Sequence, residues 1–193
     1  NNITALSLGF LNPDNSSFNI GQRNIIGLDV FAQKQFNSFS SWLSYSLNQS
    51  QSRFENLNNN KDFTSKSNVT HSLSAALSYK LNGFQFALGW KWQTGKPFTI
   101  AKDSIDGLEF NDGINTVELP IYHRLDLSST YDFKLSKYNK LRGEIGLSIR
   151  NIYNRKSLIS KEYRGNNSIG DPIEIIEKLS IGITPNLMFR IYW

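Results

Sequence analysis

The chain has 193 residues, enough for one sizeable domain, and it has no cysteine, which excludes disulfides, thiol catalysis and cysteine metal sites. Its net charge is +5, from 21 basic and 16 acidic residues, but the basic residues are scattered, so we expect no nucleic-acid partner. The mean hydropathy is −0.39. No run of about 18 apolar residues predicts a membrane-spanning helix.

The chain begins with turn-forming residues and continues in a regular alternation. Residues 1–22 predict a loop, with a short alternation that fits the end of a preceding strand. From residue 23 onwards apolar residues alternate with polar ones, and a period of two predicts β-strands with one apolar and one polar face. The alternation recurs near residues 26–32, 43–47, 73–79, 84–92, 125–133 and 141–149, and over residues 178–193. We therefore predict seven long antiparallel strands, with a tight hairpin at Asn82-Gly83.

The connections between these strands alternate between short and long. Long polar segments lie near residues 50–69, 94–118 and 155–177, and the other connections are brief. This rhythm is typical of outer-membrane β-barrels, which have short periplasmic turns and long extracellular loops. We interpret residues 23–193 as barrel strands in a bacterial outer membrane. The C-terminus is then periplasmic, and residues 1–22 are extracellular.

Aromatic residues supply a second indication of a membrane. They make up 13% of the chain, and by register they gather near the two ends of the predicted strands, as interface girdles do. The predicted membrane-interface aromatics are Tyr79, Phe84, Trp90, Trp92, Tyr131 and Phe133. The last predicted strand, residues 178–193, ends on an aromatic residue. Such an ending fits the signal that the barrel-assembly machinery reads, carried here by Phe189, Ile191 and Trp193.

Charged residues alternate onto the opposite face, which would be the inner face of a barrel. The predicted lumen- or plug-facing residues are Asp29, Lys91, Arg124, Asp126, Arg142, Glu144, Arg150 and Arg190. They either form a substrate path or pair with neighbours, for instance Arg124 with Asp126 and Arg142 with Glu144. So many charges favour a wide lumen over an eight-stranded barrel, whose interior is filled by side chains.

An odd number of strands leaves two unpaired sheet edges, and bacterial single-chain barrels have an even number. Either a strand lies within residues 1–22, or further strands lie on another polypeptide or on another part of the same protein. We expect about seven strands of a barrel of about 22, a known class with a plugged lumen.

Four motifs in order resemble those of TonB-dependent outer-membrane receptors, particularly the non-SusC kind of Bacteroidota. They are residues 94–98 (TGKPF), 119–128 (LPIYHRLDLS), 149–156 (IRNIYNRK) and 182–187 (GITPNL). The resemblance covers residues 20–193 and implies the last third of such a receptor, which imports a scarce nutrient such as an iron chelate, cobalamin, glycan fragments or peptides. The implied partners are the remaining N-terminal barrel and plug, TonB through that plug, outer-membrane lipid and a surface lipoprotein.

Other functions have less support. Asp103, Asp106, Glu109 and Asp112 lack the spacing of an EF-hand Ca²⁺ loop, and two isolated histidines, His71 and His123, would need further ligands for zinc. No local signature predicts catalysis or a cofactor. Two rival classes stay open: a small autonomous outer-membrane barrel with an adhesive or structural role, and a soluble carbohydrate-binding sandwich.

Overall fold

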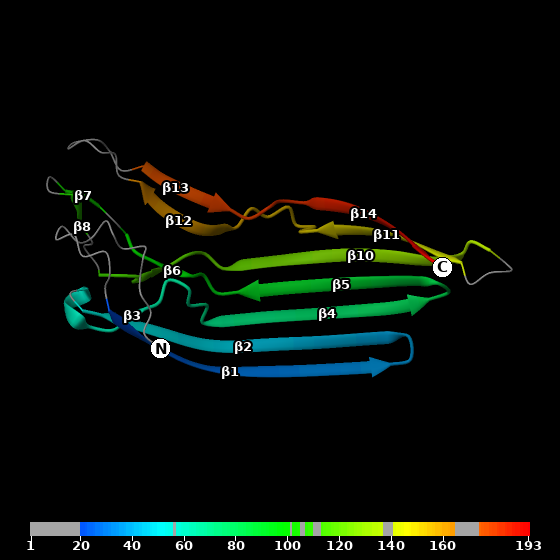
Figure 1. The fold of residues 1–193 in the computed structure, drawn as a ribbon, viewed down its shortest axis with the longest axis horizontal. Helices are drawn as coiled ribbons and strands as arrows, with labels where there is room; N and C mark the ends of the chain where they lie inside the picture. The colour runs from blue at the N-terminus through cyan, green and yellow to red at the C-terminus, as the bar shows by residue number, and fades with distance from the viewer. Residues whose placement is uncertain are drawn as a thin grey trace.

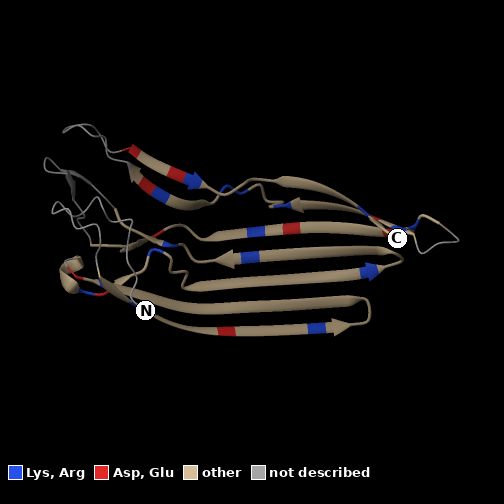
Figure 2. Ribbon diagram, viewed as in Figure 1, with Lys and Arg blue, Asp and Glu red and all other residues tan. Residues whose placement is uncertain are grey.

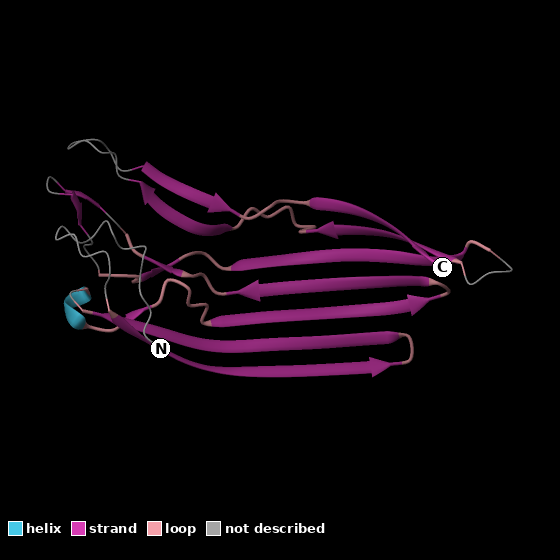
Figure 3. Cartoon of the chain, in the orientation of Figure 1, coloured by secondary structure: helices cyan, strands magenta, loops and turns pink. Residues whose placement is uncertain are grey.

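The computed structural model is an antiparallel β-protein, and it describes residues 20–55, 57–100, 102–104, 107–109, 113–136, 141–164 and 174–193. Apart from a single 3-10 turn, η2 (Asn58–Asn60), the regular structure of these residues is strand (Figure 3). In the same residues, no helix is long and apolar enough to cross a membrane.

Seven long strands form one sheet, in which neighbours in the chain are neighbours in space (Figure 1). They are β1 (Gly21–Phe36), β2 (Phe39–Phe54), β4 (His71–Leu81), β5 (Phe84–Gln93), β10 (Tyr122–Lys134), β11 (Arg142–Arg150) and β14 (Thr184–Tyr192). The all-β class and the seven antiparallel strands are therefore confirmed. Within the described residues, β1 and β14 are the two edges of an open sheet and do not pair with each other.

The two ends of the sheet differ, as Figure 1 shows. At the turn end lie the tight β1–β2 and β4–β5 turns, where Asn37, Asn82 and Gly83 have the positive φ that such turns require, which confirms the predicted Asn82-Gly83 hairpin. The loop end carries the small pairs. They are β3 (Phe63–Thr64) on β2, β6 (Pro97–Phe98) with β9 (Val117–Glu118), β7 (Lys102–Ser104) with β8 (Gly107–Glu109), and β12 (Leu158–Arg164) with β13 (Glu174–Leu179).

The prediction of one continuous strand over residues 178–193 is wrong. β13 ends at Leu179 and pairs with β12, and β14 begins at Thr184 and pairs with β11. The residues between them bond to a turn instead of to a neighbouring strand. Asn154 Oδ1 accepts the N–H of Ile183 at 2.9 Å, and Asn151 Nδ2 donates to the carbonyl of Ile181 at 2.9 Å. These side-chain contacts replace the ladder and separate the loop hairpin from the sheet.

The strand register divides the sheet into an apolar and a polar face. A row of directly paired residues crosses the apolar face at Leu43, Ala75, Trp90 and Leu125, and the next position on each strand faces the other way. The apolar face is not packed into a core: Leu187 is 72% exposed and Phe189 is 59% exposed. Of the described large hydrophobic residues, only Phe54 and Leu119 are buried.

Candidate functional site: a basic pocket on the polar face

All eight residues predicted to face a lumen lie on the polar face. The cross-strand pairs Lys91–Arg124, Asp29–Ser46 and Glu144–Arg190 all point to that side, opposite the apolar rows. Figure 2 shows the basic positions of β5 and β10 side by side on the half of the sheet nearer the loops. Register therefore joins residues far apart in sequence, and whether the face lines a lumen stays a prediction.

The charges on the polar face pair only in part. Arg124 Nε lies 2.9 Å from Asp126 Oδ1, which confirms one predicted pair. The predicted pairing of Arg142 with Glu144 is wrong: Glu144 lies 3.6 Å from Arg190 and accepts a hydrogen bond from the Tyr192 hydroxyl, whereas the Arg142 guanidinium lies over the Tyr192 ring. The reason is geometric. Arg190 on β14 lies directly opposite Glu144 on β11. Residues that are directly opposite on neighbouring strands are closer to each other than residues two positions apart on one strand, as Arg142 and Glu144 are.

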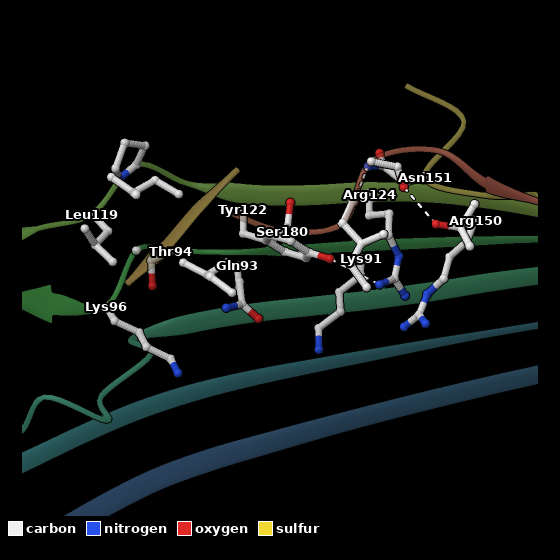
Figure 4. A pocket seen from close by; sticks show the side chains of 17 residues that line it. Lys91, Gln93, Thr94, Lys96, Leu119, Tyr122, Arg124, Arg150, Asn151 and Ser180 are labelled. Atoms are coloured by element: carbon white, nitrogen blue, oxygen red, sulfur yellow. Dashed lines mark hydrogen bonds between the residues drawn. The ribbon is translucent and has the colours of Figure 1, made fainter. Parts of the chain in front are cut away.

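A pocket of about 440 Å³ opens at the loop end of this face. Its walls are β5, β10, the end of β11 and the segment before β14, and the basic side chains extend into it from the same side of the sheet (Figure 4). Its charged lining consists of Lys91, Lys96, Arg124 and Arg150; within the described residues, no carboxylate lines it. The arrangement suits a negatively charged group.

The Lys91 and Arg124 side chains face each other directly across β5 and β10. Like charges at such positions repel. Asp126 offsets the charge of Arg124, and the Tyr122 hydroxyl accepts a further bond from Arg124 Nη1 at 3.2 Å. In the described part of the chain, the side chains of Lys91 and Arg150 make neither an ion pair nor a hydrogen bond. The pocket therefore keeps excess positive charge.

One wall of the pocket is held by Asn151, a residue that is 2% exposed and has φ of 56°. Its Nδ2 donates to the carbonyls of Arg155 and Ile181, both at 2.9 Å, and its backbone N–H donates to Asp126 Oδ1 at 2.8 Å. The left-handed conformation, which asparagine tolerates better than most residues, turns the chain at the end of β11. Asn151 thus places the segment before β14 against β10.

The opposite wall depends on Gly95. A Cβ at this position would lie 1.6 Å from the carbonyl oxygen of Leu119, so only glycine lets the two backbone segments approach this closely. Leu119 N–H in turn donates to the Lys96 carbonyl at 2.9 Å, next to the β6–β9 pair. The motif at residues 94–98 therefore shapes the pocket wall.

The apolar face carries aromatic residues at both ends, and all six predicted interface aromatics lie on it. At the turn end Phe84 and Tyr131 have ring centroids 4.4 Å apart, and Phe133 follows at 6.1 Å from Tyr131. Nearer the loops lie Trp90 and Trp92. On β14, Phe189 and Ile191 face the same side, and Trp193 is 96% exposed. Recognition of these three residues by the barrel-assembly machinery stays a prediction.

The remaining candidates are separate from this pocket. His71 Nδ1 bonds to the Tyr45 hydroxyl at 2.8 Å, and His123 Nε2 pairs with Arg155. The described residues contain no group of three or more metal-ligating side chains. The acidic loop Asp103, Asp106, Glu109 and Asp112 lies outside the residues whose side chains are described. At the loop end of β2, hydrogen bonding to Asp62 raises the pKa of Arg53.

Three residues of the pocket, Lys96, Tyr122 and Asn151, are not among the site residues that the sequence predicts, although each lies within one of the four receptor-like motifs. Lys96 lies in a predicted loop, where no periodicity indicates the direction of a side chain. A local signal exists for Asn151, since asparagine tolerates positive φ better than most residues and favours turns.

Comparison of the chain with known protein families, with curated proteins and with solved structures yields no match.

Proposed function

We propose that this chain is the C-terminal barrel portion of a TonB-dependent outer-membrane receptor that binds and imports a scarce nutrient. The observation that carries the proposal is the two-faced sheet: seven antiparallel strands share one continuous apolar face, and the charged residues gather on the other. In a transmembrane barrel, apolar residues face lipid and polar residues face the lumen. The motifs that resemble those of such receptors supply the receptor class.

The dimensions of the apolar face support a membrane. Aromatic residues lie near both ends of β5, at Phe84 and at Trp92, with Leu88 between them. β5 is 10 residues long, and a tilted strand needs about 9–11 residues to cross the hydrocarbon layer. The spacing of the aromatic rows thus agrees with the two interfaces of a bilayer.

Exposure of the apolar face counts against a soluble sandwich. A sandwich buries the apolar face of each sheet against a second sheet about 10 Å away. In the described residues, no second layer covers this face, and Ile26, Leu28 and Leu187 are each more than half exposed. Large contiguous apolar patches are uncommon on the surface of soluble monomers, so contact with lipid explains this exposed face better.

The unpaired edges of the sheet count against the alternative of a small autonomous barrel. Among the described residues, β1 and β14 each have one neighbour, so each leaves a row of unpaired backbone groups. In lipid each unsatisfied group costs several kcal/mol. Further strands pairing with β1 and β14 would remove that cost, as in a larger barrel with a plug.

Single-cysteine labelling tests membrane location and orientation together. The Ser67→Cys substitution lies in an exposed turn at the loop end, and Ser38→Cys in the β1–β2 turn is its matched control. Both are made in the full-length protein in a bacterial outer membrane, with any other cysteine replaced by serine. A membrane-impermeant maleimide should label the Ser67→Cys variant in intact cells, and the Ser38→Cys variant only after permeabilisation. Equal labelling of both variants, or recovery in the soluble fraction, would overturn the proposal.

Transport needs a separate measurement. Growth on limiting iron chelates, cobalamin, glycans or peptides should require the full-length protein and an intact TonB. Uptake that is independent of TonB would contradict the receptor class even if the membrane location holds.

A further inference from the structure

We propose that the basic pocket binds a small anionic solute through a carboxylate or phosphate group held between Lys91 and Arg150. The inference goes beyond the proposed function and does not depend on it, since the pocket is built by one sheet and its loops.

The pocket has more positive than negative charge. Arg124 has a counterion in Asp126 at 2.9 Å, but neither Lys91 nor Arg150 has one in the described residues. Lys96 adds a further cation to the rim. Since Lys91 also stands directly opposite Arg124, the free pocket holds repelling charges that a bound anion would relieve.

The pocket also offers several hydrogen-bond donors to a ligand. Arg124 is held by two contacts, Nε to Asp126 and Nη1 to the Tyr122 hydroxyl, which fixes its guanidinium and, among the described residues, leaves Nη2 free to donate. The Tyr122 hydroxyl accepts from Arg124, and within the described part of the chain its own proton has no acceptor, so it can donate to a ligand. Gln93 lies beside Lys91 on the same face of β5. Ammonium, guanidinium, phenol and amide donors together match the oxygens of a carboxylate or phosphate.

The volume of the pocket suits a small solute. The cavity of about 440 Å³ lies within the range of small-molecule sites, about 300–1,000 Å³. A second cavity of about 380 Å³ adjoins it through shared Lys96 and is lined by Arg23 and Lys66 as well. The basic lining therefore continues from the pocket towards β1 and favours a solute with more than one negative group.

The rigid frame supports a binding role over an incidental gathering of charges. Asn151 fixes Asp126 from one side, and the Gly95–Leu119 approach fixes the other wall. Both features keep the backbone walls and, through Asp126, the Arg124 guanidinium in place before any ligand arrives, which lowers the ordering cost of binding.

Calorimetric titration of the purified full-length protein tests the proposal, with citrate and inorganic phosphate as separate probes. At least one should bind, more weakly at higher salt. The double variant Lys91→Gln/Arg150→Gln should weaken binding about tenfold or more, because it removes two charge-assisted contacts. The control Arg142→Gln removes a cation from the turn end of the same face and should leave affinity unchanged. An unchanged unfolding midpoint shows that each variant is folded.

Binding of citrate alone supports a carboxylate solute, and binding of phosphate alone supports a phosphorylated one. Absence of binding for both, or equal binding by the double variant, overturns the proposal. Carbodiimide cross-linking of Lys91 to an acidic segment of the same protein would also overturn it, by showing that a protein carboxylate occupies the pocket. None of these results bears on membrane location, which the cysteine labels report independently.

Discussion

Asp126 Oδ1 accepts the backbone N–H of Asn151 at 2.8 Å while it pairs with Arg124 Nε at 2.9 Å. One carboxylate therefore links the charge of the pocket to the turn that ends β11. Because Asn151 also holds the segment before β14, changes at this junction should affect both stability and ligand binding.

The side chain of Asn151 is expected to stabilise the fold. Asn151→Gly keeps the positive φ accessible but leaves the carbonyls of Arg155 and Ile181 without their donor. Both hydrogen bonds are only part-buried, so losing them should cost about 0.5–1.5 kcal/mol each, the usual net contribution of an intramolecular hydrogen bond. Urea unfolding in detergent measures the change. The matched control is Asn82→Gly, also at positive φ but in an exposed turn, and it should leave stability nearly unchanged. Equal effects at both positions would show that only the backbone conformation matters.

The backbone segments at Gly95 and Leu119 lie so close together that we expect any side chain at position 95 to destabilise the protein. Gly95→Ala places a Cβ 1.6 Å from the Leu119 carbonyl oxygen, and because that oxygen belongs to the backbone and not to a flexible side chain, the wall must shift. Overpacking of this kind costs about 1–3 kcal/mol. Gly89→Ala is the control, because a Cβ there meets nothing within 4 Å. Thermal unfolding of both variants decides the point; an unaltered midpoint for Gly95→Ala would contradict the geometry.

The two faces of β5 are expected to respond differently to a charge. Leu88→Arg puts a cation in the middle of the apolar face, which in a bilayer costs about 2–4 kcal/mol. Ala87→Arg, one residue away, puts the same group on the polar face and should be tolerated better. Unfolding in lipid vesicles compares the two. If the variants behave alike, the apolar face does not contact lipid.

The aromatic end of the chain is expected to matter for assembly rather than for stability. Trp193 is 96% exposed, so Trp193→Ala removes few contacts within the sheet. We expect less folded protein in the outer membrane but an unchanged unfolding midpoint after purification. Met188→Ala, on the polar face of β14, serves as the control for assembly. Normal amounts of the Trp193→Ala variant in the membrane would contradict an assembly signal.

Local patterns were sufficient to predict the faces and turns of the sheet. Strict alternation from Phe84 to Trp92 decides which side chains share a face, because neighbouring residues of a strand point in opposite directions. The Asn82-Gly83 pair decides its turn, because both residues accept positive φ. These features depend on residues close together in the chain, and the structure agrees with them.

Tertiary structure alone decided where the last strand breaks and which charges meet. Residues 178–193 alternate without interruption, yet Asn151 and Asn154, about thirty residues earlier, bond to the backbone at Ile181 and Ile183 and end the ladder there. The pocket likewise gathers Lys91, Arg124 and Arg150 from three strands. Alternation reports the direction of each side chain but contains no information on strand register or on contacts from distant turns, and those contacts assemble the site.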